Sequence, residues 1–436
     1  MHNTARRFVL LIGFAFPSQF CVKIALVTQE ITLTKKQAQR LMLESLGLRT
    51  PPRRRADKQA LLAAIRQIHN LQIDTISVVA RAHQHILWSR LGDYQTGWLE
   101  SLHAEGKLFE YFAHAVCLLP IEDYPLFRAV MREKFVGWDN IRDWGNQNSE
   151  ILENVLAHIS QNGAVRSSDF ESKQPRGKWW DWKVEKVALE HLYYRGDLMI
   201  ARRQGFQRVY DLRERVLPGW DDAQAPDYST AVRELVQKAV KALGVANVLW
   251  ASDYFYLKKP NTITAIEQLL AEGTILPVNI EGFKRGPFFV HVDNEPLLAQ
   301  ALADQLPATH TTILSPFDPL LSDRSRAREL FDFDYLIECY TPAAKRKYGY
   351  FTLPILHRGK LIGRMDAKAW RKEKRLQVIK LFFEPGVRAT DGLAKALAKT
   401  LHAFASWQGL NNVAIDWADS DALRLNLQDH LESTQP

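Results

Sequence analysis

One short motif occurs three times in this 436-residue chain. The motif is Leu-x-x-x-Gly-x-(Leu/Ile), and it spans residues 102–108, 192–198 and 269–275. Each copy ends an amphipathic helical pattern, and its glycine can take the left-handed conformation that stops a helix. Residues typical of a strand follow each copy. The sequence therefore predicts one folding unit that is repeated along the chain.

The middle copy shows the unit most clearly. Apolar residues recur at helical spacing over 151–159, residues 167–169 can cap a short helix, and a third helix is expected from about Trp182 to Tyr194. Strands over 198–201 and 207–210 flank a turn at 204–206. Three helices followed by a hairpin are the plan of a winged helix.

The third copy repeats this plan over about 228–292, with strands at 275–278 and 288–291. The first copy is less regular and spans about 34–120. Junctions of helix, glycine and strand are common, so chance recurrence is the alternative explanation. The hairpins that follow the motifs favour a true repeat.

The pattern changes after residue 310. Strands are predicted over 351–356, 360–364 and 376–382, with a turn at 357–359. A helix follows, with Leu393, Leu397, Leu401 and Phe404 on one face. We predict an α+β chain in four units, with winged-helix units over 34–145, 146–225 and 226–305 and a β-rich basic domain over 306–436 that carries a terminal helix.

The first 30 residues imitate a signal peptide. Arg6 and Arg7 precede an apolar run from Phe8 to Phe16, which is too short to span a membrane. We expect residues 1–30 to be a poorly ordered extension or the product of a start site assigned too early. A true signal peptide is the alternative, and sequencing the amino terminus of the native protein distinguishes the two.

The cysteines and the charge limit the partners. Cys21, Cys117 and Cys339 are far apart and form no cluster with histidines, so we expect no metal site, and a cytoplasmic, nucleoid-associated location fits.

The net charge is +8, and residues 341–380 hold twelve basic residues against Asp366 and Glu373. These basic residues are Lys345, Arg346, Lys347, Arg358, Lys360, Arg364, Lys368, Arg371, Lys372, Lys374, Arg375 and Lys380.

Such a basic stripe can neutralise several phosphates of double-stranded DNA, although a solvated basic face is the alternative. As DNA contacts we select the first eight of these residues, from Lys345 to Arg371, together with Arg81. The aromatic residues Tyr348, Tyr350, Phe351 and Trp370 interleave the stripe, and core or strand positions suit them better than base stacking.

The candidate for chemistry is Gln72-Ile73-Asp74, which lies between two predicted helices. In an extended segment Gln72 and Asp74 share one side, where an amide and a carboxylate can hold a water molecule between them. A carboxylate can also stabilise the oxocarbenium-like transition state of glycosidic bond hydrolysis. The alternative is structural, because Asp74 could cap a helix that begins near Ser77.

Several longer stretches resemble one known family. They are LQIDTISVVARAHQHILWSR (71–90), LFEYFAHAVCLLP (108–120), GFQRVYDLRERVLP (205–218), LSPFDPLLSDR (314–324) and YTPAAKRKYGYFTLPIL (340–356). The chain resembles the YcaQ/AlkZ-type winged-helix DNA glycosylases over about 34–420. This resemblance implies tandem winged-helix units followed by a β-barrel-like C-terminal domain.

The resemblance also implies the chemistry. Family members excise bulky alkylated purines, and Gln72-Ile73-Asp74 is similar to the Gln-x-Asp form of the branch that unhooks interstrand crosslinks. It implies that Asp74 and Gln72 are the catalytic residues of a monofunctional DNA glycosylase that needs no cofactor. The implied substrate is double-stranded DNA that carries alkylated purines or crosslinks. The protein is expected to be a monomer and to bind no membrane. The alternative is a non-catalytic winged-helix DNA-binding protein such as a transcription regulator.

Overall fold

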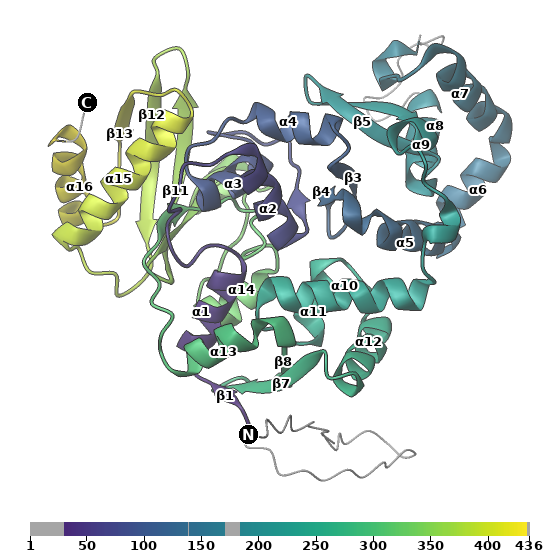
Figure 1. The fold of residues 1–436 in the computed structure, drawn as a ribbon. Helices are drawn as coiled ribbons and strands as arrows, with labels where there is room; N and C mark the ends of the chain where they lie inside the picture. Colours follow the sequence, from purple (N-terminus) through teal and green to yellow (C-terminus); the bar gives the residue numbers. More distant parts are fainter. Residues whose placement is uncertain (1–29, 138, 171–183, 434–436) are drawn as a thin grey trace.

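The computed structural model describes residues 30–137, 139–170 and 184–433 (Figure 1). The predicted extension over 1–30 lies outside these residues apart from Glu30, and so does the expected helix start at Trp182. The buried apolar side chains of the described residues form one cluster, which includes members of all three repeats and of the C-terminal region. The repeats and the C-terminal region therefore share a continuous core.

The repeated unit consists of a helix, a short extended segment, two further helices and a hairpin. In the first copy these are α2 (Lys58–Ile68), β2 (Leu71–Gln72), α3 (Ala82–Leu91), α4 (Gly97–Ala104), β3 (Leu108–Phe112) and β4 (Val116–Pro120). In the second they are α7 (Ser149–Asn162), Val165, η2 (Ser167–Asp169), α8 (Val184–Arg195), β5 (Leu198–Gln204) and β6 (Gln207–Leu212). In the third they are α10 (Tyr228–Leu243), Ala246, α11 (Val248–Tyr254), α12 (Lys259–Ala271), β7 (Ile275–Ile280) and β8 (Phe288–His291).

The three motif glycines end their helices as predicted. Gly106, Gly196 and Gly273 have φ angles of 66°, 84° and 69°. In every copy the carbonyl oxygen of the first motif leucine accepts a hydrogen bond from the residue after the glycine. These bonds are Lys107 N to Leu102 O at 3.0 Å, Asp197 N to Leu192 O at 2.9 Å and Thr274 N to Leu269 O at 2.9 Å. The motif is thus the sequence signature of a helix end that turns directly into a buried strand.

The beginning of the described chain packs with the third repeat. β1 (Thr32–Leu33) pairs in parallel with β7, and α1 (Lys35–Ser45) contacts α10, α13 (Glu295–Leu302) and α14 (Arg324–Phe331). A capping box formed by Thr34 and Gln37 starts α1. Residues 32–45 therefore lie against elements that begin at residue 228 or later.

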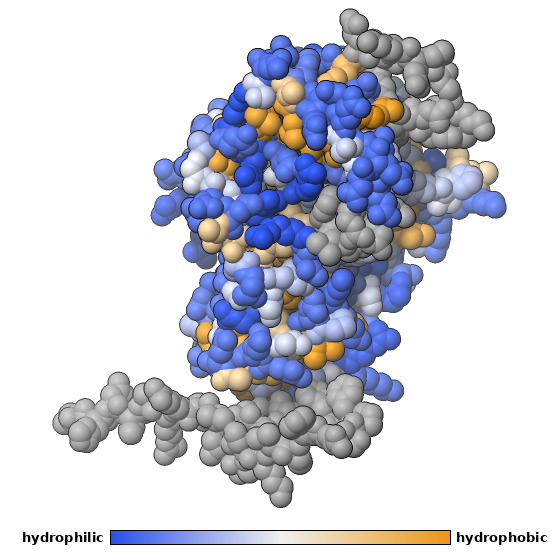
Figure 2. Space-filling model, turned by 90° about the vertical axis from the view of Figure 1, so that its right-hand side faces the viewer, coloured by the Kyte–Doolittle hydropathy of each residue, from blue (hydrophilic) through white to orange (hydrophobic). Residues whose placement is uncertain are grey.

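Six further elements of the described chain lie between the repeats or just after the third one. They are η1 (Ile121–Asp123), α5 (Tyr124–Gly137), α6 (Asp139–Gln147), α9 (Arg213–Val216), η3 (Asp222–Gln224) and η4 (Val292–Asn294). Figure 2 turns the right-hand side of Figure 1 toward the viewer, and hydrophilic side chains cover most of the face seen there.

The C-terminal region is built on a five-stranded sheet with the order β13-β12-β11-β10-β9. Its strands are β9 (Thr311–Ile313), β10 (Leu353–His357), β11 (Lys360–Trp370), β12 (Arg375–Phe383) and β13 (Asn412–Ile415). The loop before β10 holds η5 (Ala343–Lys345). Bulges at Ile362 of β11 and Ile379 of β12 bend the sheet, which is open, with β13 and β9 at its edges.

Two helices complete the C-terminal region: α15 (Asp391–Trp407) follows β12, and α16 (Asp421–Ser433) follows β13. The predicted apolar face of α15 is confirmed, because Leu393, Leu397, Leu401 and Phe404 are all buried. The sequence did not lead us to expect α16. None of the described helices is long and apolar enough to cross a membrane.

Candidate active site

The extended segment of each repeat pairs with the second strand of its own hairpin. Leu71 lies opposite Leu118, Val165 opposite Tyr210, and Ala246 opposite Phe289. The hairpins have matching registers, since Leu108, Leu198 and Ile275 lie opposite Pro120, Leu212 and His291. Gln72, Arg166 and Asn247 are therefore equivalent in the three copies, and so are Asp74, Ser168 and Leu249.

The first copy differs from the others in where its next helix begins. In the second and third copies η2 and α11 begin one residue after Arg166 and Asn247. Both of these residues start their helices: Asn247 accepts from Trp250 N at 2.9 Å, and Arg166 pairs with Asp169 at 2.7 Å. In the first copy α3 begins only at Ala82. Residues 73–81 thus form a loop peculiar to this copy, which we call the motif loop.

Asp74 lies at the start of the motif loop and is partly exposed. Its Oδ1 accepts a hydrogen bond of 2.7 Å from the backbone N–H of Ile76. No helix begins near Ser77, so the carboxylate closes a turn rather than capping a helix. Burial raises the pKa of Asp74 above its ordinary value, although the backbone N–H groups of Ile76 and Thr75 oppose this effect. No ion pair to Asp74 occurs within the described part of the chain.

Gln72 is nearly buried, with 9% of its surface exposed, and its Oε1 lies 2.9 Å from His114 Nε2. The extended conformation continues past Gln72, because Ile73 N donates to Val116 O at 2.8 Å. His114 comes from the turn between β3 and β4, and burial lowers its pKa to about 4. At neutral pH the ring is uncharged. In the tautomer that carries hydrogen on Nε2, it donates to Gln72 Oε1 and leaves the Gln72 amide N–H groups for another acceptor.

The contact between His114 and Gln72 was missed in the sequence. The only local signal was a histidine beside an aromatic strand. That pattern is common in cores and does not reveal a partner 42 residues away.

Residues of the C-terminal region donate hydrogen bonds to the backbone of the motif loop. Ala369 N, near the end of β11, donates to Val78 O at 2.9 Å, and Arg371 Nη2 donates to Val79 O at 2.8 Å. Burial raises the pKa of the Cys339 thiol, and the charge of Asp74 adds to the rise. The candidate site is therefore completed by residues almost 300 positions further along the chain.

The hairpin of the second repeat reaches the other end of the motif loop. Phe206, at the tip between β5 and β6, lies 4.2 Å from the Arg81 guanidinium and stacks on the ring of His83 at 5.8 Å. Burial and the charges of Arg203 and Arg81 lower the pKa of His83 to about 3. His83 is 6% exposed, so it positions α3 against the hairpin and is not available to phosphate. Arg81 is partly exposed and stays a predicted DNA contact.

The predicted basic contacts of the C-terminal region do not form one surface. Lys345, Lys347, Arg358, Lys360 and Lys368 are exposed. Lys360 and Ala369 lie at opposite ends of β11, about 30 Å apart along the strand. Lys360 and the neighbouring Arg358 are therefore far from the motif loop, and the sequence stripe is divided between two places.

Three of the predicted contacts are arginines with internal partners. Arg364 is 2% exposed, pairs with Glu384 at 2.5 Å and donates to Asp334 O at 2.9 Å. The prediction of a DNA contact at Arg364 does not fit this burial, because its guanidinium is enclosed by protein. Arg346 donates to Thr341 O at 2.8 Å. Arg371 donates to Val79 O but is otherwise exposed at the surface.

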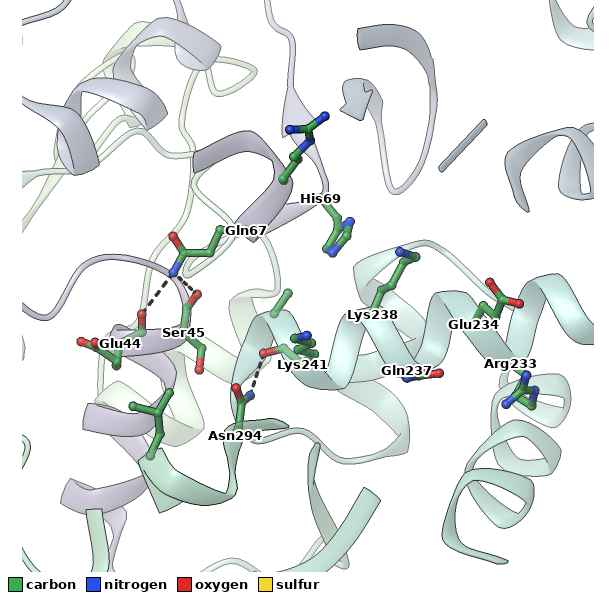
Figure 3. Close-up of a pocket in the computed structure, with 13 residues that line it drawn as sticks. Glu44, Ser45, Gln67, His69, Arg233, Glu234, Gln237, Lys238, Lys241 and Asn294 are labelled. Carbon is green, nitrogen blue, oxygen red and sulfur yellow. Dashed lines mark hydrogen bonds between the residues drawn. The ribbon is translucent and has the colours of Figure 1, made fainter. Parts of the chain in front are cut away.

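A cavity of about 600 Å³ lies on another side of the first repeat (Figure 3). α1, the end of α2 and α10 line it, and its side chains include His69, Arg233, Lys238 and Lys241. His69 and Lys238 both bind the buried carboxylate of Asp123, at 2.8 and 3.1 Å. Neither Gln72 nor Asp74 lines this cavity. No group of three or more side chains that could hold a metal ion occurs among the described residues.

Comparison with known proteins agrees with this geometry. The family model described as DNA glycosylase AlkZ-like matches residues 65–407, which include the motif loop and the strands that hold it. Among solved structures, the Streptomyces sahachiroi DNA glycosylase AlkZ matches with a TM-score of 0.61 and 16% identity, over 89% of this chain and 100% of that chain. At this identity the structural match shows the fold alone, whereas the family model covers most of the sequence. The chain belongs to the AlkZ-like DNA glycosylase family.

Proposed function

We propose that this protein is a monofunctional DNA glycosylase that hydrolyses the N-glycosidic bond of bulky N7-alkylated purines, including those in interstrand crosslinks. The observation that carries the proposal is the motif loop. Gln72 occupies the position at which Arg166 and Asn247 start helices in the other copies, but it starts no helix, and Asp74 two residues later remains partly exposed on the same extended segment. The three repeats would be winged-helix units, of which the first would present its motif loop to duplex DNA, and their boundaries near residues 145, 225 and 305 stay predictions.

Asp74 is the proposed catalytic carboxylate. Alkylation at N7 makes the purine cationic and therefore a good leaving group, so the reaction needs little protonation of the base. As the bond breaks, the sugar develops positive charge, which an ionised Asp74 stabilises. Asp74 Oδ1 is occupied by the Ile76 N–H, so Oδ2 is the oxygen that would accept a hydrogen bond from the attacking water.

Gln72 is the proposed water-holding residue. With its Oε1 bound to His114, the amide N–H groups of Gln72 can donate to the oxygen of the same water. No lysine lies between His69 and Ser77, so no amine in the motif can form an imine with the sugar. The expected product is an abasic site without strand cleavage.

The test compares two Asp→Asn variants of the first repeat on a duplex that carries one N7-alkylguanine. Asp74→Asn should slow release of the alkylated base about 100-fold or more under single-turnover conditions, as expected when a group that stabilises transition-state charge is lost. Asp57→Asn is the matched control. Asp57 caps α2 by accepting from Ala60 N at 2.7 Å, and asparagine caps equally well.

Base release at the wild-type rate by Asp74→Asn would contradict the assignment of Asp74. A covalent DNA adduct trapped with borohydride would contradict the monofunctional mechanism. A sequence-selective shift of undamaged DNA by the wild type, with no base release from the lesion duplex, would favour a non-catalytic DNA-binding protein.

A further inference from the structure

A loop of the C-terminal region has a fixed shape although it contains no strand. This loop, residues 338–349, is closed by the carboxylate of Glu338, which is 7% exposed. Its two oxygens accept from the backbone N–H groups of Lys347, Tyr348 and Gly349 at 2.7, 2.7 and 3.1 Å. Arg346 ties the two sides of the loop together through its bond to Thr341 O at 2.8 Å. We call it the Glu338 loop.

The Glu338 loop displays an aromatic side chain to solvent. Tyr340 is 92% exposed, the highest value among the large apolar or aromatic side chains of the described residues, and Tyr350 just beyond the loop is 41% exposed. Lys345 and Lys347 on the same loop are also exposed. An exposed ring on a preorganised backbone loses little entropy on binding, and neighbouring cations suit a polyanion. Aromatic rings with this surrounding are typical stacking platforms for nucleobases.

The loop lies beside the candidate active site. Gly349 packs against Asp366 of β11 so closely that a Cβ there would lie 2.4 Å from Asp366 Oδ2. Three residues further along the same strand, Ala369 binds Val78 of the motif loop. Cys339, the residue before Tyr340, is the thiol that responds to the charge of Asp74. The Glu338 loop, which carries Tyr340, therefore packs on the strand that binds the motif loop.

We propose that Tyr340 stacks on a nucleobase of the bound duplex at the lesion, next to the nucleotide that faces Asp74. The proposal rests on the proposed glycosylase function for the identity of the ligand. A base whose neighbour is damaged or missing offers an unstacked face, and a tyrosine on a loop of fixed shape can cover it. The occupant is therefore duplex DNA with an interrupted base stack.

Binding to an uncleavable duplex tests the proposal independently of catalysis. The duplex carries a tetrahydrofuran abasic-site analogue with 2-aminopurine beside it, and an undamaged duplex of the same sequence is compared. Tyr340→Ala should weaken binding to the abasic duplex about tenfold, as expected for one lost stacking contact, and should remove the quenching of 2-aminopurine. Tyr340→Phe should keep both properties, because the ring is what stacks.

Tyr256→Ala is the matched control, since Tyr256 is 69% exposed but lies in the third repeat. It should bind like the wild type. The proposal is overturned if Tyr340→Ala binds the abasic duplex as tightly as the wild type does, or if Tyr340→Phe is as weak as Tyr340→Ala. Absence of base release by the wild type would defeat the proposed function alone, because the binding difference between the variants does not depend on hydrolysis.

Discussion

Burial shifts the pKa values of Asp74 and His114 in opposite directions. Burial raises the pKa of Asp74 and lowers that of His114 to about 4. The carboxylate has to be ionised to stabilise a cation, so the rate of base release should fall as the pH falls through the raised pKa of Asp74. His114 remains neutral above about pH 4 and adds no second ionisation. In the proposed mechanism Asp74 alone sets the pH dependence, and His114 acts by orienting Gln72.

Substitution of His114 tests this division. His114→Leu removes the hydrogen bond to Gln72 and should slow single-turnover base release about tenfold, because one such bond corresponds to about 1.4 kcal/mol. The pH at which the rate is half-maximal should not move. His114→Gln places an amide N–H near the position of Nε2 and should recover most of the rate. A shifted pH profile, or a His114→Gln enzyme as slow as His114→Leu, would show that His114 does not act through Gln72.

At the scale of elements, the hairpins of the first and second repeats are joined by a buried carboxylate. Glu110 of β3 is 3% exposed and binds Arg203 of β5 at 2.7 Å and Arg208 of β6 at 2.6 Å. Burial acts to raise the pKa of Glu110, but the hydrogen bonds and charges of both arginines outweigh it and lower the pKa. This cluster holds the β5–β6 hairpin where Phe206 meets Arg81.

Glu110→Gln should therefore destabilise the protein more than a surface substitution does. It leaves the largely buried guanidinium of Arg203 without a counter-charge and Arg208 with Glu190 alone, at a cost of about 3 kcal/mol or more. The free energy of unfolding in urea measures the effect. Glu105→Gln is the control, because Glu105 forms an exposed pair with Lys58 and such pairs contribute little. Equal stability of the two variants would mean that the Glu110 cluster does not hold the hairpins together.

At the scale of the molecule, the net charge of +8 suits a polyanionic ligand, but only part of it lies near the motif loop. The double substitution Lys345→Ala with Lys347→Ala should lower the dependence of DNA affinity on salt, by about 0.9 per lost phosphate contact in the slope of log K against log salt. Lys258→Ala with Lys259→Ala removes the same charge from the third repeat and should leave the slope unchanged. Equal slopes for the two double variants would place the DNA elsewhere.

How much of this structure the sequence predicts depends on how far apart in the chain the contacting residues lie. Capped helix ends, hairpins and the apolar face of α15 follow from residues a few positions apart, and the structure confirms them. Contacts across the chain were not predictable. Arg90 donates to both carboxylate oxygens of Asp318 at 2.6 and 3.0 Å, a pair that joins two of the stretches carrying the family resemblance. The hydrogen bond from Ala369 N to Val78 O also joins distant parts of the chain. The burial of Arg364 likewise depends on a partner outside its own basic run, Glu384.

The late start of α3 also bears on how such a chain could acquire its chemistry. If the three units descend from one duplicated ancestor, the copies at Arg166 and Asn247 retain a plain helix start, whereas the first copy has a longer connection at the same place. Duplication makes such a change tolerable, because two unaltered units continue to support the fold. New activity then requires no new fold, only an insertion of a few residues at one junction and a neighbour that holds the inserted backbone in place.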